Sequence, residues 1–157
     1  MKSGVPEIVT VRAATVDDIP AVLALWTAAT TEPSVTDDEE GVRALLRVDP
    51  ESLLLAIEGE GEGDGEAIVG TVIASWDGWR GAMYRLAVQP SHRRRGIAAM
   101  LVEHGERRLH ALGARRFHLI VLPDEAAANA FWTAAGYERQ DDRLRYVKTF
   151  SPAGRLL

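Results

Sequence analysis

The stretch LAVQPSHRRRGIAAMLV, residues 86–102, decides the fold expected for this chain. It reads as the end of an apolar strand, a turn with three consecutive arginines (Arg93, Arg94 and Arg95), and a helix that begins near Gly96. A helix N-terminus carries partial positive charge and unpaired N–H groups, so arginine has the wrong sign for this position. Three arginines at a helix N-terminus, where positive charge is unfavourable, indicate that an anion binds at the turn.

The turn has the chemistry of an anion cradle. A strand end, a turn and a helix that starts at glycine direct unpaired N–H groups outward, and Gly96 lets the backbone come close to a ligand. A phosphate group fits such a cradle. Arginine triplets also occur on solvated surfaces, so the triplet alone leaves ordinary surface charge open as an alternative.

Apolar patterns on both sides of the turn predict a mixed α/β domain in the order βααβββαβαββ. Strands are expected at residues 8–12, 53–58, 67–76, 82–88, 116–123, 137–140 and 143–150, and helices at 19–29, 36–48, 96–113 and 124–136. The early strands are expected to be antiparallel, and residues 82–122 read as a strand–helix–strand crossover. The glycine-rich and acidic segment at 59–66 is expected to be a mobile hairpin loop.

Composition excludes several classes of function. The 157 residues carry a net charge of −5, which argues against a dedicated nucleic-acid binder, and no apolar run approaches the roughly 20 residues that span a bilayer. The absence of cysteine and of a signal-peptide pattern favours a cytoplasmic protein. The four histidines lack metal-ligand spacing and there is no GxSxG motif, so neither a metal site nor a serine hydrolase is expected.

Two motifs resemble the GNAT superfamily of acyl-CoA-dependent N-acyltransferases. The family signature Q/R-x-x-G-x-G/A appears as RRRGIA at residues 93–98, and FWTAAGYE at 131–138 is similar to its second marker, an aromatic residue before a helix end with glycine and another aromatic. The detailed resemblance covers residues 82–138. It implies one N-acetyltransferase domain over residues 1–157, with a mostly antiparallel central sheet and one parallel strand pair that splays at the cofactor site.

The resemblance implies acetyl-CoA as the acyl donor. Its pyrophosphate would rest on the amides of the turn, arginine side chains would reach phosphates, and the pantetheine arm would pair with the preceding strand end. That strand end would also supply an N–H to polarise the thioester carbonyl. The implied cofactor-binding residues are Leu86, Ala87, Val88, Arg93, Arg94, Arg95, Gly96, Ile97, Ala98, Ala99, Asn129 and Trp132.

The sequence departs from the family at three positions. Trp132 stands where a tyrosine commonly protonates the leaving thiolate, and an indole N–H is a far weaker acid. Glu125 stands where many members have a cofactor-binding asparagine, with Asn129 one turn later as a substitute. Ala82 stands where some members have the glutamate base.

Tyr84 and Glu32 are the candidate catalytic residues. Two-residue alternation places Tyr84 on the strand face of Ala82, Leu86 and Val88, directed at the reacting centre, although a packed core tyrosine is the alternative. Glu32 and the acidic residues 37–40 are expected to border the acceptor groove; the alternative is a set of solvated acids in a first helical turn.

The predicted activity is transfer of acetyl from acetyl-CoA to a primary amine of a small molecule or a peptide or protein N-terminus, by direct attack in a ternary complex. Two alternatives remain open: an acyl-CoA-binding module with little transfer, and a protein whose arginine turn contacts nucleic acid or an acidic partner. The expected partner is the amine acceptor, with neither nucleic acid nor membrane, and a homodimer is a compatible assembly.

Overall fold

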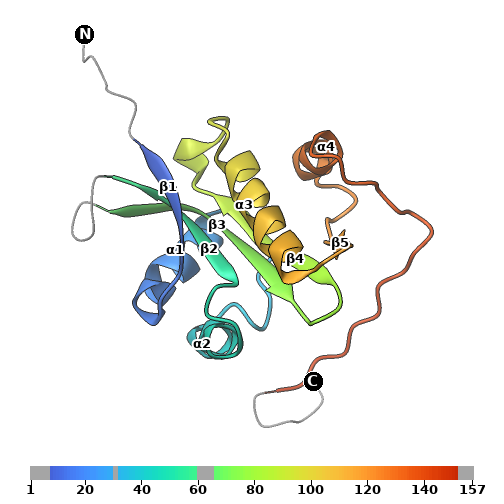
Figure 1. Ribbon diagram of the computed structural model, residues 1–157, viewed down its shortest axis with the longest axis horizontal. Helices are drawn as coiled ribbons and strands as arrows, with labels where there is room; N and C mark the ends of the chain where they lie inside the picture. The colour runs from blue at the N-terminus through green and yellow to red at the C-terminus, as the bar shows by residue number, and fades with distance from the viewer. Residues whose placement is uncertain (1–7, 30–31, 60–65, 152–157) are drawn as a thin grey trace. The chain divides into compact units, whose positions relative to one another are not determined.

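The computed structural model describes residues 8–29, 32–59 and 66–151, and the chain divides into two compact units, residues 1–120 and 121–157. None of the described helices is long and apolar enough to cross a membrane. The second unit contains α4 (Ala126–Ala134). The first contains β1 (Val9–Ala13), the 3₁₀ turn η1 (Val16–Asp18), α1 (Ile19–Ala29), α2 (Glu39–Val48), β2 (Leu53–Glu58), β3 (Ala67–Trp76), β4 (Gly81–Val88), the 3₁₀ turn η2 (Pro90–His92), α3 (Ile97–Leu112) and β5 (Phe117–His118) (Figure 1).

The strands of the first unit form one sheet in the order β1-β2-β3-β4-β5. The pairs from β1 to β4 are antiparallel, as predicted, and β2 and β3 are neighbours although residues 60–65 of the expected loop lie outside the described residues. β4 and β5 are parallel, which confirms the crossover through α3. Their pairing consists of Gly81 with Phe117 and Ala82 with His118. Beyond Ala82, β4 has no strand neighbour on that side within the described residues, so the two strands are splayed.

Helices cover both faces of the sheet. α3 lies on one face, where a Cβ added at Gly70 of β3 would meet Leu101 and Ile97 (Figure 1). α1 and α2 lie on the other face. The buried core on that side includes Leu25, Trp26, Val42, Leu53, Leu55 and Ile73. β4 therefore has α3 on one side and the core built by α1 and α2 on the other.

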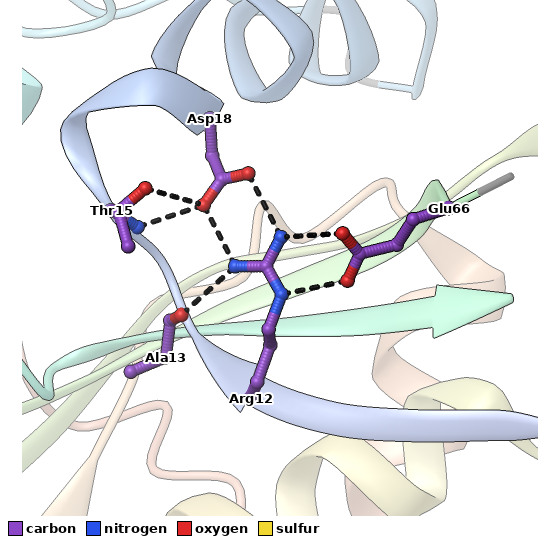
Figure 2. A network of polar contacts seen from close by, with 5 residues as sticks. All are labelled: Arg12, Ala13, Thr15, Asp18 and Glu66. Atoms are coloured by element: carbon purple, nitrogen blue, oxygen red, sulfur yellow. Dashed lines mark hydrogen bonds and ion pairs between the residues drawn. The ribbon is translucent and has the colours of Figure 1, made fainter. Parts of the chain in front are cut away.

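A partly buried ion-pair cluster, shown in Figure 2, joins β1 to the residue that precedes β3. Arg12 of β1 donates from Nη1 and Nη2 to the two carboxylate oxygens of Asp18 at 2.8 and 2.9 Å, and from Nε to Glu66 at 2.8 Å. Asp18 also accepts from the backbone N–H of Thr15 at 2.8 Å. The paired donors of the guanidinium match both carboxylates, so one side chain joins β1, η1 and the residue before β3.

Three expected strands differ from the structure. The strand predicted at 116–123 is reduced to Phe117–His118, because the open edge of β4 offers no pairing beyond Ala82. The hairpin predicted at 137–140 and 143–150 is wrong: no strand forms at 137–149. Leu144, Tyr146 and Val147 there are 81, 88 and 70% exposed, and a two-stranded hairpin that buries no apolar face is marginal in water.

Candidate active site

The arginine turn (residues 93–98) has the backbone geometry of an anion cradle. Arg94 and Gly96 have φ of 64° and 78°, in the left-handed region. Met100 is the first residue of α3 whose amide bonds to the preceding turn, to the carbonyl of Gly96 at 3.1 Å. Within the described residues, the amides of residues 94–99 have no acceptor. Unpaired N–H groups at a helix start bind anions, so the sequence-based prediction of a cradle has a matching geometry here.

Gly96 leaves the space over this turn open. A Cβ built at this position meets nothing within 4 Å, and the positive φ disfavours any other residue. The backbone is thus accessible to a bulky anion such as a pyrophosphate. A side chain at this position would enter the space where such a ligand approaches.

A carboxylate of the chain itself neutralises part of the positive charge at the arginine turn. Glu58, the last residue of β2 and 9% exposed, accepts from Nη1 of Arg95 at 3.3 Å and lies 2.7 Å from Nε2 of His92. Its carboxylate thereby holds two residues of the loop between β4 and α3. Sequence reasoning missed this contact because Glu58 ends an apolar run that is remote in sequence from the turn.

The other two arginine side chains differ from each other. Arg93 donates from Nη2 to the carbonyl of Ala29 at the end of α1, at 3.3 Å. Arg94 is exposed, and its side chain has no hydrogen-bond or ion-pair partner among the described residues. Arg94 is therefore the member of the triplet whose charge is most available to an external anion.

β4 contains a bulge beside the turn. Tyr84 pairs with Ile73 and Ala87 pairs with Thr71, so two residues of β4, Arg85 and Leu86, lie opposite a single residue of β3. Arg85 has a φ of 52°, which an arginine rarely adopts. No glycine marks this position, so a bulge is not expected here from glycine placement.

The bulge sets the direction of one amide. The carbonyl of Arg85 accepts from Thr71 Oγ1 of β3 at 2.8 Å, and Thr71 Oγ1 accepts from Trp26 Nε1 at 2.9 Å. In a trans peptide the N–H of the next residue points opposite to this carbonyl. The N–H of Leu86 therefore points away from β3, toward the open edge of β4.

The bulge also reverses the predicted face of some side chains. Simple alternation predicts Tyr84 on the face of Ala82, Leu86 and Val88, but the extra residue shifts the alternation after Tyr84. Val88 pairs with Gly70 and thus faces α3, whereas Tyr84 faces the side of α1 and α2. The prediction is wrong for Val88, and Leu86 lies within the bulge without a partner on β3. Tyr84 is 50% exposed, which excludes the alternative of a packed core tyrosine.

Most of the acidic run before α2 is already engaged. Asp37 forms a bidentate ion pair with Arg85, at 2.9 and 2.6 Å. Asp38 caps α2, and Glu39 pairs with Arg43 one turn later at 2.9 Å. Asp38 and Glu39 are therefore ordinary first-turn acids, Asp37 is engaged by Arg85, and the expected acidic border of an acceptor groove stays a prediction.

Glu32 and Glu40 are the remaining acids of this segment. Both are exposed, and neither pairs with a side chain among the described residues. The catalytic role of Glu32 stays a prediction. No group of three His, Cys, Asp or Glu side chains in the described part of the chain could hold a metal ion.

The second unit holds the two other predicted cofactor residues. Asn129 of α4 donates from Nδ2 to the carbonyls of Leu122 and Glu125, at 3.0 and 2.9 Å. The Trp132 ring lies edge-on to the Tyr137 ring, with centroids 4.9 Å apart. These local contacts order the helix and its end, and the roles of Asn129 and Trp132 toward a cofactor stay predictions.

A mixed sheet that opens beside a turn of unpaired amides defines the class of protein: an α/β domain with the GNAT-like fold expected from the two motifs. A model of the acetyltransferase (GNAT) family matches residues 19–137. An acetyltransferase of Pectobacterium atrosepticum is 37% identical over 125 residues, which are 80% of this chain and 84% of that protein. The chain belongs to the GNAT family of acetyltransferases.

Solved structures show the same fold. The ribosomal-protein-S18-alanine N-acetyltransferase of Escherichia coli is similar with a TM-score of 0.69 at 21% identity, over 95% of this chain and 88% of that chain. AAC(6')-Iy, in complex with the bisubstrate analog CoA-S-monomethyl-acetylneamine, is similar with a TM-score of 0.68 at 20% identity, over 90% and 99%. The GNAT-like fold predicted from the two motifs is confirmed.

Proposed function

We propose that this chain transfers acetyl from acetyl-CoA to a primary amine of a small molecule or of a peptide or protein N-terminus. The observation that carries the proposal is the set of unpaired amides at residues 94–99, beside a strand edge to which Leu86 directs its N–H. Family membership supports acetyl transfer, and AAC(6')-Iy, of the same fold, is in complex with a CoA-containing analog.

The residues at the turn fit such a donor. The amides of residues 94–99 and the open space at Gly96 suit a pyrophosphate, and Arg94 adds a cation. Leu86 and Val88 present main-chain groups along the open edge, where an extended pantetheine amide can pair as a strand would. Ala87 differs from its neighbours, because its main chain is paired toward β3 through Thr71.

The proposed reaction needs few catalytic side chains. Bound acetyl-CoA supplies a thioester. The neutral acceptor amine attacks its carbonyl carbon, the C–S bond breaks after the C–N bond forms, and the proton that the nitrogen loses passes to water. The N–H of Leu86 donates to the carbonyl oxygen as negative charge develops there. Tyr84 is the candidate proton donor to the thiolate, which is a tolerable leaving group because its thiol has a reference pKa of about 8.5. Alignment of the two substrates supplies much of the rate.

A second candidate function is acyl-CoA binding with little transfer. Ala82 and Trp132 favour it, because neither can replace the glutamate base or the tyrosine acid that the family resemblance leads one to expect. The nucleic-acid alternative is weaker, because Arg95 and Arg93 are engaged by Glu58 and by the carbonyl of Ala29.

The test is release of CoA from acetyl-CoA, followed with a thiol reagent, against a panel of amines, amino acids, polyamines, aminoglycosides and peptide N-termini. Turnover that requires one amine class supports the transferase. Tight CoA binding by calorimetry without turnover supports the binding module. Absence of both, with salt-dependent binding to DNA or RNA, would overturn the proposal.

The whole chain, residues 1–157, is proposed to act as one N-acetyltransferase domain. The family match supports this, because residues 19–137 extend across the division between the two units at residues 120 and 121. A cytoplasmic location and a homodimer stay predictions.

A further inference from the structure

Several contacts converge on Arg85, the residue at the centre of the β4 bulge. Among the described residues, Arg85 and Arg94 are the only ones other than glycine with a positive φ. An L-residue adopts this conformation at a steric cost, and neither a glycine nor an asparagine is present to reduce it. The surrounding residues must therefore hold Arg85 in place.

The side chain of Arg85 is fixed by a shielded carboxylate. Nε and Nη2 donate to the two carboxylate oxygens of Asp37 at 2.9 and 2.6 Å, and Asp37 is in turn bound by the backbone N–H of Ser34 at 2.8 Å. The Asp37 side chain is 12% exposed and that of Arg85 is 23% exposed. A bidentate pair with this shielding restricts the guanidinium in both position and orientation.

The backbone of Arg85 is fixed from the other direction. Thr71 Oγ1 donates to the Arg85 carbonyl, and Trp26 Nε1 donates to the same hydroxyl oxygen. The indole ring of Trp26 also lies 5.8 Å from the guanidinium carbon of Arg85. Trp26 thus lies against the guanidinium of Arg85 and also orients the Thr71 hydroxyl that holds the Arg85 carbonyl.

We propose that Arg85 is a positioning residue, whose ion pair with Asp37 holds the bulge in its left-handed conformation and keeps the Leu86 N–H directed at the open edge of β4. The pair also joins this amide to the loop that precedes α2. The proposal rests on the proposed function, because there the Leu86 N–H polarises the acyl carbonyl. If the bulge relaxed to a negative φ, the peptide between Arg85 and Leu86 would rotate and the donor would be misplaced.

The comparison of Arg85→Ala with Arg85→Gly distinguishes orientation of the Leu86 N–H from a contribution of the ion pair to stability alone. Both variants lose the ion pair, but glycine adopts a positive φ freely and alanine does not. We expect Arg85→Ala to lower kcat by about 100-fold, the effect of misplacing a catalytic donor. Arg85→Gly should recover kcat to within about 10-fold of the wild type, since its backbone keeps the bulge.

The Asp37→Asn variant tests whether the ion-pair partner of Arg85 is needed to hold the bulge. It keeps the arginine but removes the charge, so kcat should fall by about 10-fold, whereas adding Asp37→Asn to Arg85→Gly should cost no more than about twofold. The matched control is Asp49→Asn, which breaks the comparably shielded pair with Arg108 on α3. The control variant should lose thermal stability and keep the wild-type kcat.

Two further measurements complete the test. CoA binding by calorimetry should stay within about twofold in all five variants, because CoA lacks the acyl carbonyl. The ¹⁵N-resolved backbone shifts of residue 85 and Leu86 should change in Arg85→Ala and be restored in Arg85→Gly. Equal kcat in the alanine and glycine variants, or unchanged shifts in Arg85→Ala, would overturn the proposal. If the wild type turns over no amine, the proposed function fails, and the shifts alone decide whether Arg85 holds the bulge.

Discussion

A carboxylate oxygen of Glu58, at the end of β2, lies 2.7 Å from Nε2 of His92, just before the arginine turn. The same oxygen accepts from Arg95. An inner strand of the sheet thus supplies a fixed anion to the loop that is proposed to bind an external one. The internal anion offsets part of the repulsion among the arginines, and it leaves the amides of residues 94–99 free for a ligand.

Glu58→Gln should destabilise the fold by roughly 1 to 3 kcal/mol, typical of hydrogen bonds to charged groups, because His92 and Arg95 lose a common partner. In a chain of this size, that corresponds to a fall in Tm of about 3–10 °C, measurable by scanning calorimetry. Glu39→Gln, which breaks an exposed pair with Arg43, is the control and should change Tm by less than about 2 °C. Equal changes in both variants would refute a special role for Glu58.

Gly96→Val should weaken CoA binding by at least about 10-fold, because the new side chain occupies the space where the pyrophosphate approaches. Gly113→Val is a matched control at the other end of α3, since Gly113 also has a positive φ of 104° and open space around its Cβ position. Both variants should lose stability by roughly 1 to 2 kcal/mol from backbone strain. Wild-type CoA affinity in the folded Gly96→Val protein, measured by calorimetry, would remove the cradle assignment.

Arg94→Ala should cost about 1 to 3 kcal/mol of acetyl-CoA binding, because this side chain has no partner among the described residues and is free to reach a phosphate. Arg95→Ala should cost less, because Glu58 already holds that guanidinium. KM values for acetyl-CoA and for a truncated acetyl-pantetheine provide the measurement. If Arg94→Ala raises both KM values equally, the side chain does not contact phosphate.

Tyr84→Phe should lower kcat by about 100-fold if the phenol is the proton donor, which is the lower end of general acid–base effects. Because the Tyr84 side chain is half exposed, the Tm of the Tyr84→Phe protein should differ little from that of the wild type. Trp132→Phe is the comparison, and it should keep most of the activity because an aromatic side chain remains. A large fall in kcat for Trp132→Phe with intact CoA affinity would instead give the indole N–H a direct role.

The Arg12 cluster makes stability depend on pH in the acid range. Hydrogen bonds from Arg12 lower the pKa of Asp18 below its ordinary value of 3.8, so the folded chain holds this proton less tightly than the unfolded chain. The stabilisation is therefore fully present above pH 3.8 and is lost as the pH falls through the lower, folded-state pKa. Asp18→Asn should be less stable near neutral pH and should lose less stability on acidification. Urea unfolding at a series of pH values checks both, and parallel pH profiles would contradict the assignment.

Elements with strong local signals could be predicted from the sequence. The helix expected at 96–113 spans Ile97–Leu112, because Gly113 provides the left-handed residue that ends it. β2 is buried along its whole length, as its apolar composition indicates. The arginine turn was identifiable for the same reason: its glycine, its charges and its position between a strand and a helix are adjacent in sequence.

Features that depend on distant partners could not be predicted. The bulge at Arg85 is held by Asp37, Thr71 and Trp26, none of which is near it in sequence. The one available signal was an arginine within the otherwise apolar strand AMYRLAV, which requires an acidic or aromatic neighbour if it is shielded. At 137–150 the alternation of polar and apolar residues predicted strands. A strand also needs a surface on which its apolar face can pack, and the sequence pattern does not show whether one is present.

The short pairing of β4 with β5 also bears on the behaviour of the protein between reactions. An unpaired strand edge is a template on which other chains can add, and this one extends beyond Ala82 without a strand neighbour among the described residues. Under the proposed function, a donor paired along the same edge would block that addition and raise the apparent Tm in proportion to the logarithm of its concentration above Kd. Substrate supply would then govern shelf life and solubility as well as rate, because the strand edge that binds the donor is also an edge on which another chain can add.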